Sequence, residues 1–196
     1  MSGKSSDSEY EGDESPFPED ESPEKLSEDA LGILSSRFLA ALADKDAGKV
    51  DRAEEELRAI LQLEPRLAEP RLELARILLD TERHEDAEEH ARTGLENLLK
   101  SGPWTDEIPE NTLKALAHAL LAEILRRRAD EDDVIFGDPD EWRALLEESK
   151  KQFEAAHALD PADEYASYHA FFLGLKAHKG AKVEFDDGIE PDPDEA

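Results

Sequence analysis

Apolar side chains recur at intervals of three and four residues along the middle of the chain. The clearest stretches hold Ala53, Leu57, Ile60, Leu61 and Leu63; Leu72, Leu74, Ala75, Ile77 and Leu78; Leu113, Leu116, Leu120, Leu121, Ile124 and Leu125; and Leu145, Phe153, Ala156 and Leu159. This spacing places the apolar groups on one face of a helix, and the surrounding Ala, Leu, Glu and Arg favour helices. No stretch alternates apolar and polar residues long enough to predict a strand. The sequence therefore predicts an all-α fold.

Proline and glycine mark where the predicted helices end. Glu64-Pro65, Ser101-Gly102-Pro103 and Asp160-Pro161 each follow an apolar stretch, and proline cannot continue a helix because it lacks an amide hydrogen. Asp138-Pro139 also has the features of a helix start, since aspartate favours the N-cap and proline the first helical position.

The apolar pattern repeats at longer range. Ala53 stands 34 residues before Ala87. Leu74-Ala75-Arg76-Ile77-Leu78 returns almost unchanged as Leu121-Ala122-Glu123-Ile124-Leu125, and Leu39-Ala40-Ala41-Leu42-Ala43 is a looser version. Phe153-x-x-Ala156-x4-Pro161 has the spacing of Leu57-x-x-Ile60-x4-Pro65. Over roughly residues 30–180, this pattern resembles the tetratricopeptide repeat, a helix–turn–helix unit with small residues where its two helices cross.

The resemblance implies an α-solenoid of about three antiparallel helix pairs, closed by a C-terminal capping helix over about 163–178. The expected small residues at the crossings are Ala40, Ala75 and Ala122 on the first helices, and Ala53 and Ala87 on the second. Small groups facing large ones let helices approach to about 8–10 Å, and the pairs must stack to bury their apolar faces.

Three departures from a regular repeat are predicted. The first pair needs one extra residue in its turn, because otherwise Asp44 falls on an apolar position. Segments 100–110 and 130–144 interrupt the third pair, and Ser149 stands where its second helix should carry the packed alanine.

Charge divides the chain into three parts. The 196 residues carry a formal net charge of −28; residues 1–29 hold eleven acidic and two basic groups, and residues 183–196 hold seven acidic groups and no basic one. Such segments bury too little apolar surface to offset the entropy of ordering. We expect a disordered acidic tail over 1–29, a helical repeat domain over 30–180 and a second disordered tail over 181–196. Phe17 and Phe185 are isolated aromatic residues in these tails.

Composition excludes several classes of function. Strong acidity disfavours nucleic acid and anionic membranes, which bind through Lys and Arg. The start of the chain has no apolar signal segment, no stretch approaches the roughly 18 apolar residues of a membrane span, and cysteine is absent. These observations predict a cytoplasmic location.

No catalytic motif is present, so we predict a protein that is not an enzyme and uses no cofactor or metal. His84 and His90 are six residues apart, which places them on opposite sides of a helix, whereas two metal ligands on one helix need a spacing of three or four. We interpret them as solvated polar residues. The acidic stretch 130–141 lacks the residue order of a calcium-binding loop.

The leading hypothesis is a protein-interaction module or adaptor that holds a peptide or helix of a partner in a concave groove. In proteins that this chain resembles, the first helix of each pair lines that groove. Carried over by register, the predicted partner-binding residues are Glu69, Leu72, Arg76 and Leu79; Leu116, Ala119, Glu123 and Arg126; and Tyr165, Tyr168, Phe172 and Leu175. Arg76 is the only obvious cation of pair two, which favours an apolar or amphipathic partner over a C-terminal carboxylate.

Two alternative functions stay open. Size and acidity resemble the repeat chaperones of bacterial type III secretion, and the acidic tails would suit a decoy or sequestrant of basic proteins. The aromatic stripe from Tyr165 to Leu175 also has three interpretations. It lines the groove, forms a homodimer seam, or is covered by Val183 and Phe185 of the tail.

Overall fold

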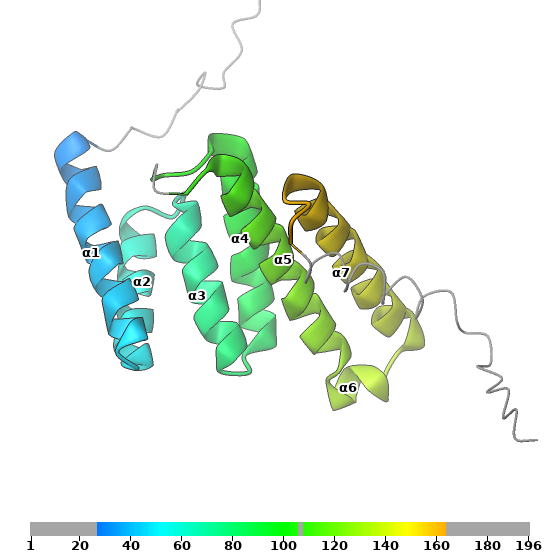
Figure 1. The fold of residues 1–196 in the computed structure, drawn as a ribbon. Helices are drawn as coiled ribbons and strands as arrows, with labels where there is room; N and C mark the ends of the chain where they lie inside the picture. Colours follow the sequence, from blue (N-terminus) through cyan, green and yellow to red (C-terminus); the bar gives the residue numbers. More distant parts are fainter. Residues whose placement is uncertain (1–26, 106–107, 164–196) are drawn as a thin grey trace, which may run out of the picture.

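The structure is a computed structural model, and it describes residues 27–105 and 108–163. This part of the chain contains seven helices and no strand, which confirms the predicted all-α class (Figure 1). Their bounds are α1 Glu28–Asp46, α2 Val50–Leu63, α3 Ala68–Asp80, α4 His84–Ser101, α5 Glu110–Ala129, α6 Asp132–Ile135 and α7 Pro139–Leu159. None of these helices is long and apolar enough to cross a membrane.

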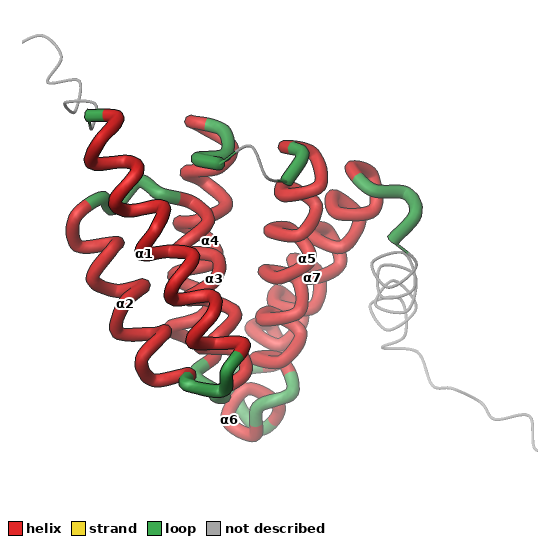
Figure 2. The backbone as a smooth tube through the Cα atoms, turned by 60° about the vertical axis from the view of Figure 1, so that its left-hand side comes forward, coloured by secondary structure: helices red, strands yellow, loops and turns green. Residues whose placement is uncertain are grey.

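The helices form three antiparallel pairs that stack side by side. α1 packs on α2, α3 on α4, and α5 on α7, while contacts between α2 and α3 and between α4 and α5 join the pairs (Figures 1 and 2). The single turn α6 lies in the connection between α5 and α7. A solenoid of three pairs is therefore confirmed. The predicted capping helix over 163–178 and most of both acidic tails lie outside the described residues.

Side-chain caps fix where α1 and α7 begin. The Ser27 hydroxyl accepts a hydrogen bond from the amide of Ala30 at 3.3 Å, and the Asp138 carboxylate accepts one from the amide of Asp140 at 2.9 Å. The predicted helix start at Asp138-Pro139 is thus confirmed. The predicted interruption to residue 144 is wrong in its second part, because residues 139–144 belong to α7.

Small residues occupy the helix crossings as predicted in pairs two and three. Ala53, Ala75, Ala87 and Ala122 are each 0% exposed, and so is Ser149. The Ser149 hydroxyl donates to the carbonyl oxygen of Ala122 at 2.7 Å, which satisfies a buried polar group at the contact of α7 with α5. This bond confirms the predicted register of pair three.

The predicted register of pair one is wrong by one residue. Ala40 is exposed and Ala41 is the buried alanine. Ala41 precedes Ala53 by the same twelve positions that separate Ala75 from Ala87, so the turn contains no extra residue. Asp44 does occupy an apolar position of the repeat, and it is accommodated because its carboxylate pairs with two cations, Lys49 at 3.0 Å and Arg52 at 3.1 Å.

The turns within pairs one and two have the same hydrogen bonds, 34 residues apart. The amide of Gly48 donates to the carbonyl of Lys45, and the amide of Glu82 donates to that of Leu79. Gly48 has φ +75° and Glu82 has φ +60°. Glycine adopts this left-handed conformation without the steric cost that a side chain imposes, so Glu82 carries local strain where the first turn carries none.

The second helices also share a repeated ion pair. Glu54 on α2 accepts from Arg58 one turn later and from Arg83 in the next turn of the solenoid. Glu88 on α4 does the same with Arg92 and with a cation of the following pair, Arg128 on α5. These glutamates directly follow the buried alanines, so each repeat is linked to its neighbour at the same place.

This linkage predicts a pH-dependent stability. The hydrogen bonds from Arg83 lower the pKa of Glu54, with burial acting in the opposite direction. The Glu54→Gln variant should lose about 1 kcal/mol of unfolding free energy at pH 7. A lowered pKa in the folded state stabilises above the ordinary value, near about pH 4.3, and this stabilisation disappears as pH falls through the folded value.

Urea unfolding of both proteins between pH 7 and pH 2.5 tests this expectation. The difference between them should shrink toward zero at the acid end. A difference that stays constant over the whole range would show that the carboxylate charge of Glu54 contributes nothing.

Candidate partner-binding groove

A pocket opens between the first helices of the three pairs. We call it the central pocket; its volume is about 190 Å³. It is lined by Phe38 and Leu42 of α1; Glu69, Leu72, Glu73 and Arg76 of α3; Leu113, Leu116, Ala117 and Leu120 of α5; and Thr105 and Ile108 of the α4–α5 connection. Most of these side chains are apolar, and every first helix contributes.

Sequence reasoning missed the contribution of α1. Phe38 and Leu42 stand 34 residues before Leu72 and Arg76, so the repeat spacing itself could have found them. The one-residue error at Ala40 concealed this equivalence.

The central pocket includes four of the predicted site residues, Glu69, Leu72, Arg76 and Leu116. Leu79, Glu123 and Arg126 do not line it. Leu79 packs half-buried against the core. The pocket crosses the first helices obliquely, and on α5 it lies nearer the N-terminal end than the repeat register predicts.

The other predicted residues lie elsewhere. Glu123 and Arg126 belong to an ion-pair cluster near the C-terminal end of α5, where Glu123 also pairs with Arg127. Ala119 is half-buried against the core. Tyr165, Tyr168, Phe172 and Leu175 lie outside the described residues.

Glu69 has a structural role that its sequence position did not indicate. The residue is 7% exposed, and its Oε1 accepts hydrogen bonds from the backbone amides of Trp104 at 2.7 Å and Thr105 at 3.0 Å. Two hydrogen bonds to a charged acceptor hold the α4–α5 connection against α3. Glu69 thereby shapes one wall of the central pocket.

The rim of the central pocket carries balanced charge. Glu73 forms ion pairs with Lys45 of α1 and with Arg76, the latter at 3.8 Å. The Arg76 side chain is 46% exposed. Leu116 is also exposed, at 44%, although it is a large apolar residue. An open apolar surface with a few paired charges at its edge suits an amphipathic partner better than a highly charged one.

The volume limits what the central pocket can hold. Small-molecule sites usually measure roughly 300–1,000 Å³, so a pocket of about 190 Å³ is too small for most of them. One or two apolar side chains of a larger partner fit this size. The geometry is therefore that of a surface that receives anchoring side chains.

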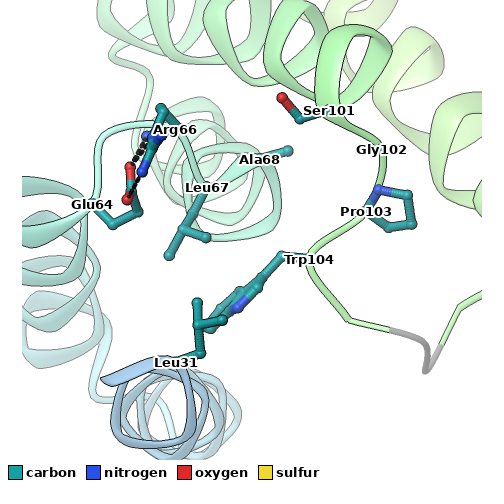
Figure 3. Close-up of a pocket in the computed structure, with 9 residues that line it drawn as sticks. All are labelled: Leu31, Glu64, Arg66, Leu67, Ala68, Ser101, Gly102, Pro103 and Trp104. Carbon is teal, nitrogen blue, oxygen red and sulfur yellow. Dashed lines mark hydrogen bonds and ion pairs between the residues drawn. The ribbon is translucent and has the colours of Figure 1, made fainter. Parts of the chain in front are cut away.

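A second apolar pocket lies at the end of the stack where α1 begins. This Trp104 pocket has a volume of about 370 Å³ and is lined by Leu31, Glu64, Arg66, Leu67, Ala68, Ser101, Gly102, Pro103 and Trp104 (Figure 3). At its edge Arg66 holds the Glu64 carboxylate and lowers its pKa. Trp104 contacts Phe38 with ring centroids 5.9 Å apart, so Phe38 separates this pocket from the central one.

Trp104 could not be placed from the sequence. It follows Gly102, whose φ of +75° ends α4, and its position depends on the Glu69 hydrogen bond. An isolated tryptophan between two helical stretches is the only sequence signal for this pocket.

A third pocket, at the opposite end of the stack, is polar. It is lined by Glu82, Arg83, His84, Glu85, Asp86, Glu131 and Asp133. The residues that the structure describes contain no group of three or more histidines or carboxylates arranged to hold a metal ion.

The two histidines of α4 face different neighbours. His84 Nδ1 lies 2.5 Å from a carboxylate oxygen of Glu131, whereas His90 Nδ1 lies 3.4 Å from the guanidinium of Arg71 on α3. Burial and the charge of Arg71 lower the pKa of His90. The interpretation of His84 as solvated is wrong, because its side chain is only 12% exposed.

Comparison with known proteins agrees with this architecture. Residues 45–101, which run from the end of α1 through α4, match the family model of the tetratricopeptide repeat. No curated protein matches the chain. The family match and the three stacked helix pairs confirm the predicted resemblance: this is a tetratricopeptide repeat protein. Such repeats generally mediate protein–protein interactions and are typically not enzymes.

Proposed function

We propose that this protein is an interaction module or adaptor that binds an amphipathic helix or an apolar peptide segment of a partner protein across α1, α3 and α5. The central pocket receives the main apolar anchor of that segment. The charged pairs around Glu73 contact its polar side.

The exposure of Leu116 carries this proposal. A soluble helix stack has no need to leave a large apolar side chain 44% exposed beside a pocket lined by Phe38 and Leu72. Burying such groups contributes about 25 cal/mol for each Å² removed from water. Anchors in central, well-packed pockets supply most of the affinity of protein interfaces.

The Leu116→Asp variant tests the proposal. A carboxylate at this site must lose its hydration when an apolar anchor docks, so partner capture should fall at least about tenfold, which corresponds to about 1.4 kcal/mol. Leu99→Asp on α4 is the matched control, because Leu99 is 54% exposed and does not line the pocket. Both variants should retain the melting temperature of the parent.

The measurement is affinity capture from the native lysate, followed by titration of each captured protein against the three purified chains. Equal affinity for the parent and for Leu116→Asp would remove the pocket from the interaction. The same comparison separates the groove from the acidic tails, since basic proteins held by residues 1–29 or 183–196 would still bind to Leu116→Asp.

A further inference from the structure

The Trp104 pocket is an apolar surface next to the point where the described chain begins. Leu31, one of its lining residues, stands four positions after Ser27, the first described residue. Four residues of helix span about 6 Å. Residues 1–26 therefore join the fold within one helical turn of the pocket.

This connection gives the N-terminal segment an advantage over any free partner. A tether of ten residues reaches up to about 33–36 Å, and a short flexible tether maintains an effective concentration in the millimolar range. Even a weak contact with the pocket is then well populated. Leu26, directly before the Ser27 cap, occupies the position that favours packing on Leu31, which directs the segment toward the pocket.

One sequence feature in this segment matches the pocket. Phe17 is flanked by Pro16 and Pro18. Proline fixes its own φ and restricts the residue before it, so little conformational entropy remains to be lost on docking. Aromatic-lined surfaces commonly recognise extended proline-containing segments, and Pro103 and Trp104 provide such a surface.

Charge agrees with this pairing. Phe17 is followed, after Pro18, by the acidic run Glu19, Asp20 and Glu21. The guanidinium of Arg66 lies at the edge of the pocket, and its side chain is 43% exposed. The acidic run therefore has a nearby cation when Phe17 occupies the pocket.

We propose that Phe17 docks into the Trp104 pocket of its own chain, so that the segment 16–18 covers the end of the stack. This inference is independent of the partner proposed for the central pocket. It does add a form of regulation, because Phe38 borders both pockets. A partner long enough to span both pockets must displace Phe17.

Trp104 itself reports on this contact. The chain has two tryptophans, Trp104 and Trp142, and the second lies on α7, so a Trp142→Phe background leaves one emitter at the pocket. In the full-length chain, Phe17→Ala should shift Trp104 emission to longer wavelength and increase its quenching by acrylamide, because water reaches the indole. Phe185→Ala, in the other acidic tail, is the matched control and should change neither quantity.

Two further measurements identify the occupant. The Phe17→Ala effect should be the same at all protein concentrations, since the contact is within one chain. A synthetic peptide of residues 10–26, added at about millimolar concentration to match the effective concentration of the tether, should restore the parent emission to the Phe17→Ala chain, whereas the same peptide with alanine for Phe17 should not.

Three results would overturn the proposal. One is unchanged emission and quenching in Phe17→Ala. Another is a concentration-dependent effect, which would assign the pocket to a second copy of the chain. The third is an equal response to Phe185→Ala, which would show no preference for the N-terminal segment.

Discussion

The Ala75→Arg and Ala87→Arg variants are each expected to lose about 4 kcal/mol or more of unfolding free energy. Both alanines are 0% exposed and belong to the main core, at the contact of α3 with α4. An arginine at either site needs space that close packing does not provide. It also buries a charge that has no partner. Urea unfolding monitored by circular dichroism measures the loss.

A matched control comes from the corrected register. Ala40 is exposed, whereas its neighbour Ala41 is buried in the same core. Ala40→Arg should therefore change the unfolding free energy by less than about 0.5 kcal/mol, while Ala41→Arg should behave like Ala75→Arg. If the effects at positions 40 and 41 were reversed, the assigned packing of α1 would be incorrect.

The Phe153→Ala variant is expected to lose about 4 kcal/mol, the usual cost of deleting a buried phenyl ring and leaving a cavity. Phe153 on α7 is 0% exposed and is among the largest fully buried side chains of the described residues. Its loss should weaken the last helix pair most, because each pair in a solenoid contacts only its neighbours.

Phe136→Ala is the corresponding control. Phe136, directly after α6, is 83% exposed, so truncating it removes little burial and should cost less than about 0.5 kcal/mol. Thermal and urea unfolding of both variants, with the parent alongside, gives the comparison. Similar losses at positions 136 and 153 would contradict the packing of α7 against α5.

The fold was predictable because its main signals are local and repeated. Alanine at the helix crossings, the 34-residue step from Ala53 to Ala87 and the Asp138-Pro139 cap all appear directly in the sequence. The error in pair one arose because Asp44 stands at an apolar position. Its accommodation depends on Lys49 and Arg52, whose orientation no periodicity argument supplies.

The candidate site was predictable only in part. Leu72, Arg76 and Leu116 were found because the first helix of each pair lines the inner surface. The position of the pocket along α5 depends on how that longer helix packs, and sequence register did not predict it. Trp104 was missed for a related reason, since a connection without a counterpart in the repeat takes its path from a tertiary contact, here Glu69.

Regular spacing was the reason why pairs one and two could be compared residue by residue, and it also determines how this chain can lengthen. Ala53, Glu54 and Arg58 have counterparts at Ala87, Glu88 and Arg92, and the turn at Gly48 has its counterpart at Glu82. A tandem copy of residues 48–81 inserted after position 81 would therefore place every crossing, ion pair and turn back in phase. Such a duplication adds one more inner helix carrying Leu72 and Arg76, and so extends the inner surface by one repeat. The third pair has no equivalent block, because connections of unequal length flank α5 on both sides. New repeats can thus arise by duplication within the first half of the array, while α5 and α7 stay its fixed end.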